Sequence, residues 1–194
     1  MSDLSAFSLA GRRVLVTGAN TGIGRGIAVS VSRAGADVVG AGRSAMDETA
    51  AQIEATGGGR FEAVSCDLSD KAAAQAMLDQ VWAAGPLDGL VNNAGVIRRA
   101  DAVDFTEADW DEVMAVNLKS LFFLSQAFGR KTLEEGRRGK IINIASMLSF
   151  QGGIRVASYT ASKHGVLGLT RLRMGGEGDQ RQRHRARLYR DQQH

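Results

Sequence analysis

Short apolar runs alternate with longer amphipathic stretches along the first 170 residues of the chain. Each short run holds five or six residues, many of them β-branched, and predicts a buried strand, whereas apolar side chains between the runs recur at helical spacing. The predicted strands cover residues 13–17, 37–41, 61–66, 87–91 and 140–145, and the predicted helices cover residues 27–34, 46–56, 71–84, 110–130 and 158–172. The alternation predicts an α/β fold, in which a Rossmann-like, doubly wound parallel sheet lies between helices in three α/β/α layers.

Composition narrows the class of protein. The chain has 194 residues, of which 44% are hydrophobic and 23% charged, as expected for one globular domain. The single cysteine, Cys66, excludes an internal disulfide, and with three histidines it gives no metal-ligand spacing, so we expect no metal. No apolar run reaches membrane-spanning length and no signal peptide is visible. We therefore expect a cytoplasmic protein without a membrane partner.

The net charge of +3 comes from the end of the chain. Residues 171–194 contain seven basic and three acidic residues and few apolar ones, so the pattern changes near Thr170. We interpret residues 1–172 as the domain and residues 173–194 as a non-native, disordered basic tail. The stretch RQRHRARLYR could bind nucleic acid through phosphate contacts. We favour no nucleic-acid partner, because the tail has no lysine and the remaining chain is nearly neutral.

A glycine-rich turn follows the first predicted strand and opens the next helix. It reads Thr17-Gly18-Ala19-Asn20-Thr21-Gly22-Ile23-Gly24. Such a turn lets the backbone approach a pyrophosphate at a helix N-terminus, although the glycines could also serve only a tight turn. At the end of the second strand, Arg43 stands where an acidic residue would read a ribose 2′-hydroxyl. An arginine there suits the 2′-phosphate of NADP, or it is an ordinary solvated side chain.

Acid–base chemistry is indicated at the end of the fifth strand. Ser146 stands where parallel sheets bind ligands, and Tyr159 lies four residues before Lys163. This spacing places the phenol and the ammonium on one helix face, where the cation would stabilise the phenolate. Alone, the Tyr-x-x-x-Lys pattern is most often a solvated helix face.

The combination of these motifs with Asn92-Asn93-Ala94-Gly95 and Asn117 resembles the short-chain dehydrogenase/reductase family over residues 8–171. The resemblance implies a nicotinamide-dependent oxidoreductase with Asn117, Ser146, Tyr159 and Lys163 as its catalytic tetrad. Tyr159 would exchange a proton with the substrate oxygen, Ser146 would hold that oxygen, Lys163 would bind the nicotinamide ribose, and Asn117 would order a relay water.

The resemblance also implies a binding site for the coenzyme, which we expect to be NAD, with NADP as the alternative. Asp67 matches a position that contacts adenine. The implied cofactor-binding residues are Thr17, Gly18, Asn20, Gly22, Ile23, Gly24, Arg43, Asp67, Leu68, Asn93, Ala94 and Gly95, together with Tyr159 and Lys163.

Within the family, residues 96–127 and 139–166 are similar to dehydrogenases of sugar acids of the 2-deoxy-D-gluconate type, which act in the breakdown of pectin-derived sugar acids. The resemblance implies a small sugar-acid substrate and, for an intact member, a homotetramer built through the two long helices. Ser146, Arg98, Arg99 and Arg155 are the candidate substrate residues, because arginine suits a carboxylate. Solvated surface arginines, and another substrate such as a 3-oxoacyl group, remain alternatives.

Members of this family continue through two further strands, which we expect this chain to lack. Codons for residues 178–189 can be chosen so that a shifted frame encodes GINVNAIAPGY, which resembles the family's sixth strand and Pro-Gly turn. We therefore hypothesise a frameshift, which the nucleotide sequence of the gene can test. We expect the intact gene to encode an active enzyme and this chain to be weak or inactive, or to bind coenzyme without turnover.

Overall fold

The computed structural model describes residues 5–172. The expected basic tail, residues 173–194, and with it the stretch of the hypothesised frameshift, lie outside the described residues. Five strands form one parallel sheet in the order β3-β2-β1-β4-β5. They are β1 (Arg13–Thr17), β2 (Asp37–Gly42), β3 (Phe61–Ser65), β4 (Gly89–Asn92) and β5 (Lys140–Asn143). The predicted Rossmann-like, doubly wound fold is confirmed.

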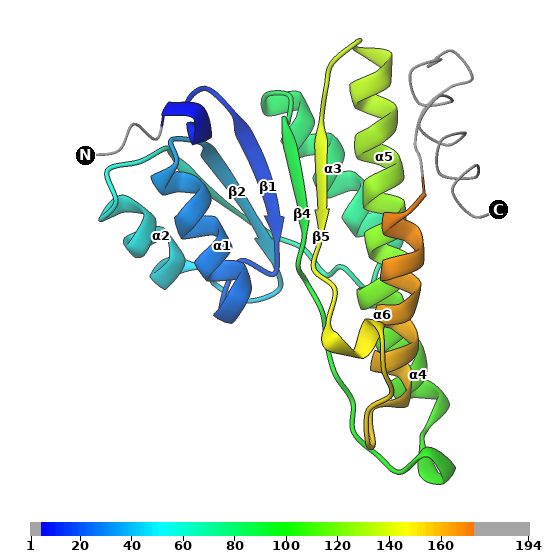
Figure 1. The fold of residues 1–194 in the computed structure, drawn as a ribbon. Helices are drawn as coiled ribbons and strands as arrows, with labels where there is room; N and C mark the ends of the chain where they lie inside the picture. The colour runs from blue at the N-terminus through cyan, green and yellow to red at the C-terminus, as the bar shows by residue number, and fades with distance from the viewer. Residues whose placement is uncertain (1–4, 173–194) are drawn as a thin grey trace, which may run out of the picture.

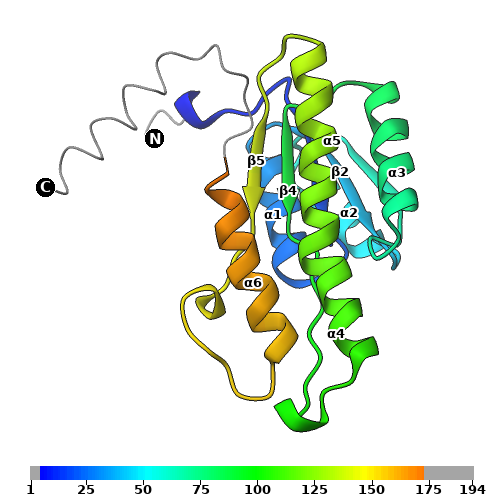
Figure 2. The ribbon, with the colours of Figure 1, turned by 90° about the vertical axis from the view of Figure 1, so that its right-hand side faces the viewer.

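Helices cover both faces of the sheet (Figure 1). On one face lie α1 (Gly22–Arg33) and α2 (Asp47–Glu54), and on the other lie α3 (Lys71–Ala84) and α5 (Leu121–Glu134). The helix α4 (Glu107–Met114) precedes α5, and α6 (Ala157–Thr170) packs against α4 and the segment that joins α4 to α5, on the side of β5 (Figure 2). Three short 3₁₀ turns are Ser5–Phe7, Ala102–Asp104 and Met147–Ser149. No helix among residues 5–172 combines the length and apolarity needed to cross a bilayer.

Two apolar clusters, one on each face, hold the layers together. Successive side chains of a strand point to opposite faces, so Val14 and Val16 enter the cluster under α1 and α2, whereas Leu15 enters the cluster under α3 and α5. The side chains of these two valines and of Leu15 are all buried. The continuous apolar sequence of this strand is thus explained by helices on both sides of the sheet.

The longest predicted helix, residues 110–130, differs from the structure. Helical backbone runs from residue 107 to residue 134, but a π-helical segment, Ala115–Ser120, separates α4 from α5. A π-helical turn holds an additional residue, and such turns frequently occur at functional sites. Asn117 lies inside this segment.

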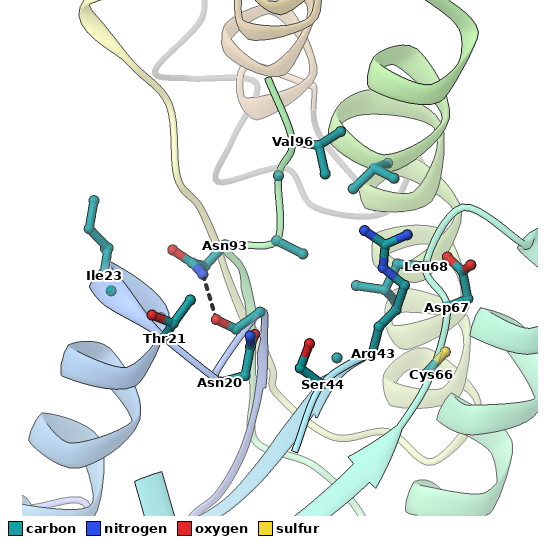
Figure 3. Close-up of a pocket in the computed structure, with 17 residues that line it drawn as sticks. Asn20, Thr21, Ile23, Arg43, Ser44, Cys66, Asp67, Leu68, Asn93 and Val96 are labelled. Atoms are coloured by element: carbon teal, nitrogen blue, oxygen red, sulfur yellow. Dashed lines mark hydrogen bonds between the residues drawn. The ribbon is translucent and has the colours of Figure 1, made fainter. Parts of the chain in front are cut away.

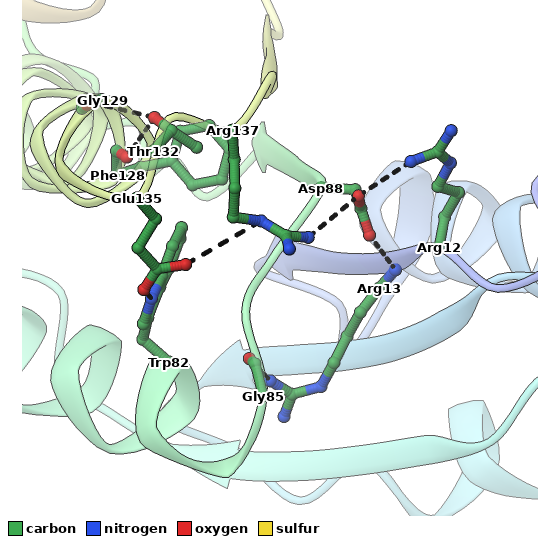
Figure 4. A network of polar contacts seen from close by, with 10 residues as sticks. All are labelled: Arg12, Arg13, Trp82, Gly85, Asp88, Phe128, Gly129, Thr132, Glu135 and Arg137. Atoms are coloured by element: carbon green, nitrogen blue, oxygen red, sulfur yellow. Dashed lines mark hydrogen bonds and ion pairs between the residues drawn. The ribbon is translucent and has the colours of Figure 1, made fainter.

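Asp88 joins three elements at the amino ends of the strands (Figure 4). Its carboxylate accepts hydrogen bonds from the backbone N–H of Arg13 at 3.0 Å, from Arg12 at 3.1 Å and from Arg137 at 3.4 Å. Arg137 also lies 3.9 Å from Glu135. These contacts tie β1 and the start of β4 to the connection between α5 and β5, at the end of the sheet opposite its carboxyl ends.

Among the described residues, β5 pairs with β4 alone and forms one edge of the sheet. Ile142 on this strand is an apolar side chain that is 55% exposed. An exposed apolar edge strand offers unpaired backbone groups to other chains and favours aggregation.

Candidate active site

A cavity of about 390 Å³ opens at the carboxyl ends of the strands, where parallel α/β sheets bind ligands (Figure 3). Loops that follow β1, β2, β3 and β4 contribute its walls. The lining residues are Gly18, Asn20, Thr21, Gly22, Ile23, Gly24, Gly42, Arg43, Ser44, Cys66, Asp67, Leu68, Asn93, Ala94, Gly95, Val96 and Val116. Every residue of the expected coenzyme site lines this cavity except Thr17, Tyr159 and Lys163.

The glycine turn needs its glycines for two physical reasons. Gly18 and Gly22 have φ angles of 67° and 55°, a region that other residues rarely adopt. Gly24 packs so closely that a Cβ there would collide with the carbonyl of Gly18 and with the side chain of Asn93. The turn therefore begins α1 at Gly22, five residues before the start of the predicted helix.

The geometry of this turn fits the pyrophosphate of a dinucleotide. Thr21, the residue that precedes α1, makes no side-chain cap hydrogen bond. The first N–H groups of α1 therefore stay available for a ligand, and the helix dipole favours an anion beside them. Added Cβ atoms at Gly22 would meet no atom within 4 Å, so the space beside this turn is open.

Thr17 and Asn93 hold the turn in place through hydrogen bonds. Thr17 is 2% exposed, and its hydroxyl accepts hydrogen bonds from the N–H groups of Asn93 and Ala94, both at 3.0 Å. The side-chain amide of Asn93 donates to the carbonyls of Thr17 at 3.0 Å and Gly18 at 3.3 Å. The polar groups of Thr17 are thus used within the protein, and this residue supports the site without lining it.

The other end of the cavity is charged. Arg43 and Asp67 approach it from the ends of β2 and β3 (Figure 3). Hydrogen bonds from the backbone N–H and hydroxyl of Ser69 lower the pKa of Asp67, and the positive charge of Arg43 lowers it further. Burial raises the pKa of the neighbouring Cys66 thiol, and the charge of Asp67 adds to this shift.

Tyr159 and Lys163 lie one turn apart on α6. The Lys163 side chain is almost fully buried, and its ammonium donates to the carbonyl of Ile144, just beyond β5, at 2.5 Å. The same nitrogen lies 5.6 Å from the centroid of the Tyr159 ring. Burial lowers the pKa of Lys163. The predicted arrangement of phenol and ammonium on one helix face is present.

Asn117 connects the π-helical segment to α6. It is 1% exposed, and its side chain exchanges two hydrogen bonds with the backbone of Val96, at 2.8 and 3.0 Å. Its amide also donates to the hydroxyl of Ser162 at 3.3 Å, which in turn donates to the carbonyl of Tyr159 at 2.7 Å. Ser162 therefore links two members of the expected tetrad.

Ser146 stands just past the carboxyl end of β5 and caps the 3₁₀ turn Met147–Ser149. Its hydroxyl accepts a hydrogen bond from the N–H of Leu148 at 3.2 Å, and its own N–H donates to the Ser149 hydroxyl at 3.2 Å. This pair of contacts fixes the backbone of Ser146. The serine hydroxyl still has a proton to donate to a substrate oxygen.

The three candidate substrate arginines are not among the residues that line the cavity, and they have different environments. Arg98 forms ion pairs with Glu112 at 2.6 Å and Asp109 at 3.5 Å on α4. Arg155 has a φ of 60° and pairs with Asp101 at 3.1 Å. For Arg99, which is exposed, no ion pair is found within residues 5–172. The three arginines, which the sequence alone treats alike, therefore differ in their contacts within the protein.

Several site residues carry no signal in the sequence. Val96 and Val116 are apolar residues of common type, and Ser162 is one serine among many. Thr21 lies within the glycine turn and Ser44 follows Arg43, but neither residue type marks a binding group on its own. The unpredicted members of the site are Thr21, Gly42, Ser44, Cys66, Val96, Val116 and Ser162.

Comparison with known families gives a match to "short chain dehydrogenase" over residues 12–179. The chain belongs to the short-chain dehydrogenase family. The match spans both the glycine turn of this short-chain dehydrogenase and its Tyr159 to Lys163 pair, in agreement with the resemblance noted in the sequence.

Individual relatives are similar over most of this short-chain dehydrogenase. The 2-dehydro-3-deoxy-D-gluconate 5-dehydrogenase of Escherichia coli is 54% identical over 170 residues, which cover 87% of this chain and 67% of that protein. The Bacillus subtilis protein of the same name is 50% identical over an alignment that covers 86% of this chain and 65% of that protein. A crystal structure from Agrobacterium tumefaciens is described as a candidate 2-deoxy-D-gluconate 3-dehydrogenase with bound NADP. That protein is 59% identical, and its structure superposes with a TM-score of 0.79 over 84% of this chain and 65% of that chain. The chain thus spans about two thirds of the length of these relatives.

Proposed function

We propose that this short-chain dehydrogenase transfers hydride between NADP and the CH–OH group of a sugar acid of the 2-dehydro-3-deoxy-D-gluconate or 2-deoxy-D-gluconate type. The observation that carries the proposal is the placement of Tyr159 and the buried Lys163 on α6, beyond the same end of the sheet at which the glycine turn forms a cavity. Relatives that bear these substrate names support the choice of substrate class.

The residues around the cavity suit NADP. The N–H groups at the start of α1 would bind the pyrophosphate, and Arg43 would bind the 2′-phosphate, for which a guanidinium has matching geometry. The acidic residue of β2, Asp37, stands at the other end of the strand, where its carboxylate accepts a hydrogen bond from the N–H of Arg60 at 2.8 Å. The resemblance in the sequence favoured NAD, and Arg43 leads us to propose NADP instead.

When bound, the coenzyme supplies the site that accepts or returns a hydride. In the oxidation direction, the Tyr159 oxygen takes the proton of the substrate hydroxyl, so that the alcohol becomes a carbonyl as hydride leaves its carbon. The Ser146 hydroxyl donates a hydrogen bond to the same substrate oxygen. The Lys163 ammonium stabilises the negative charge of the phenolate and would hold the nicotinamide ribose.

The carboxylate of the substrate requires a cation at the rim. We assign this role first to Arg99, because Arg98 and Arg155 already pair with carboxylates of the protein. Charge-assisted, two-pronged hydrogen bonds make arginine the side chain best suited to a carboxylate. Arg98 and Arg155 instead tie the loops after β4 and β5 to carboxylates of the protein.

Assembly and location complete the proposal. A groove of about 710 Å³ between α4, α5 and α6 is lined mainly by apolar side chains, among them Met114, Leu118, Phe122 and Leu169. A homotetramer built through these helices would cover it. We also propose a cytoplasmic location, with which a chain that needs no internal disulfide is compatible.

The test compares the reduction of NADP⁺ and of NAD⁺ with 2-deoxy-D-gluconate as substrate. Two proteins are compared, the 194-residue chain and a version in which the reading frame is restored beyond Leu172. We expect turnover in the restored protein, with preference for NADP⁺. Coenzyme binding without turnover in both proteins would reject the substrate class, and absence of coenzyme binding in both would reject the function itself.

A further inference from the structure

Two polar side chains hold the glycine turn from the side of α2, away from the cavity. Thr49, in the first turn of α2, is fully buried, and its hydroxyl donates to the carbonyl of Ala19 at 2.8 Å. Arg25, on α1, donates to the carbonyl of Asn20 at 2.8 Å and forms an ion pair with Glu48 at 2.5 Å. Two successive carbonyls of the turn are thus fixed to α1 and α2.

The start of α2 also supports the loop that carries Arg43. This loop leads directly from β2 into α2, and Met46 at its end is 4% exposed and packs against Gly40 and Gly42. Gly42 in turn adjoins the side chain of Asn20, to which an added Cβ would lie at 3.3 Å. The two ends of the cavity, the glycine turn and the Arg43 loop, therefore share one support.

We propose that Thr49 and Arg25 are positioning residues, which set the separation between the glycine turn and Arg43 and thereby the affinity for a dinucleotide that carries a 2′-phosphate. The inference rests on the proposed function in that it takes NADP as the ligand. Neither side chain lines the cavity, so both act through the backbone that they hold.

The physical reason is that such a ligand makes two anionic contacts at once. When the two binding points are held at a fixed separation, the second contact forms without further ordering of the protein. If α2 becomes loosely attached to the turn, a ligand that spans both points loses affinity. A ligand that reaches only the Arg43 end, such as adenosine 2′-phosphate, keeps its affinity.

The first experiment measures dissociation constants of the 194-residue chain for NADP⁺ and for adenosine 2′-phosphate by titration calorimetry. Thr49→Val removes the hydroxyl at nearly constant volume and leaves the carbonyl of Ala19 buried without a donor. We expect NADP⁺ to bind roughly three- to tenfold more weakly, the loss typical of one hydrogen bond. We expect the dissociation constant of adenosine 2′-phosphate to stay within about twofold of its value for the unmodified chain. We expect Thr49→Ser to restore NADP⁺ binding.

Arg25→Met gives an independent variant, with Arg33→Met as its matched control. Arg33 lies on the same helix and is exposed at its last turn, away from the glycine turn. We expect Arg25→Met to weaken NADP⁺ binding selectively, as Thr49→Val does, and Arg33→Met to leave both ligands unaffected. Equal weakening of both ligands by Thr49→Val and Arg25→Met would overturn the proposal, since it would indicate general damage to the adenosine end.

A measurement without coenzyme separates this inference from the proposed function. Hydrogen exchange of the amides of residues 18–24 should be faster in Thr49→Val than in Thr49→Ser, while exchange in the second half of α1 stays the same. If the unmodified chain binds no NADP⁺, the proposed function fails, and the exchange result alone decides whether Thr49 positions the turn. Equal exchange in the two variants would refute the positioning role.

Discussion

The ammonium of Lys163 lies 5.6 Å from the centroid of the Tyr159 ring, one turn further along α6. This close approach is made possible by the burial of the lysine side chain and by its hydrogen bond to the carbonyl of Ile144. A cation that is taken out of water at this cost, beside a phenol and near a coenzyme cavity, is typical of a catalytic group.

The burial of Lys163 gives the stability of the protein a defined pH dependence. Because the folded-state pKa lies below the ordinary value of 10.5, the unfolded chain binds more protons between the two values. Stability contributed at this position therefore increases as the pH rises from the folded-state pKa to 10.5, and is lowest at acidic pH. Lys163→Met removes this dependence, whereas Lys140→Met, on an exposed residue, retains it. Denaturant unfolding at a series of pH values measures the difference, and parallel curves for the unmodified protein and Lys163→Met would contradict it.

Tyr159→Phe should abolish most of the turnover of the frame-restored enzyme. The substitution removes the oxygen that we propose takes the substrate proton, and it keeps the ring, so we expect kcat to fall about 10²- to 10⁴-fold. NADP⁺ binding should stay within about twofold, because the ring and Lys163 remain in place. Steady-state rates and calorimetry give the two values. Turnover retained within tenfold would show that another group transfers the proton.

Arg43→Asp should reverse the coenzyme preference. The substitution replaces the proposed partner of the 2′-phosphate by a group that repels it and can accept a hydrogen bond from a 2′-hydroxyl. We expect the ratio of kcat/KM for NADP⁺ to that for NAD⁺ to fall roughly 10- to 100-fold, as for the loss of one charge-assisted contact. Arg60→Gln, at an exposed position just before β3, is the matched control. An unchanged ratio would place the 2′-phosphate elsewhere.

Asp88→Asn should lower stability without affecting the coenzyme cavity. The variant keeps the shape of the side chain but weakens its contacts with Arg12, Arg137 and the N–H of Arg13. We expect the free energy of unfolding to fall by about 1–3 kcal/mol, as for hydrogen bonds to a charged group. Urea unfolding measures this change, with Asp104→Asn on an exposed turn as the control. A loss of NADP⁺ affinity at unchanged stability would assign Asp88 a different role.

Leu118→Lys tests assembly through the groove between α4, α5 and α6. Leu118 lines this groove and lies against Gly165 of α6. A charge in an apolar interface costs enough free energy to dissociate it. Light scattering of the frame-restored protein should show tetramers, and the variant should give smaller species. A tetramer that persists in the variant would move the interface elsewhere.

Local sequence signals accounted well for some elements and poorly for others. Helix α3 begins and ends at the predicted residues because Asp70 caps it with two hydrogen bonds to N–H groups and Gly85 ends it. The start of α1 was placed five residues too late, because Gly22, Gly24 and Gly26 have low helix propensity. There the helix is favoured by the close packing of Gly24 against Gly18, a contact between distant parts of the turn.

The candidate site divides in the same way. Motifs of fixed spacing, such as Tyr159 with Lys163, could be recognised because one helix sets the distance between the two side chains. The partners of Arg98 and Arg155 could not be predicted, because they depend on how the loop after β4 folds against α4 and against the loop after β5. The link from Asn117 through Ser162 likewise depends on the crossing of two helices, which periodicity does not specify.

The π-helical segment Ala115–Ser120 makes the number of residues in this helix as important as their identity. Removing one residue from it would leave a regular α-helix, in which α4 is rotated by about 100° relative to α5. The apolar faces of α4 and α5 could then no longer both face the interior while Asn117 faces Val96 and Ser162. Conservative substitutions in this stretch should therefore be tolerated more readily than a deletion, because the length of the stretch sets the angular register between the core and the Asn117 amide.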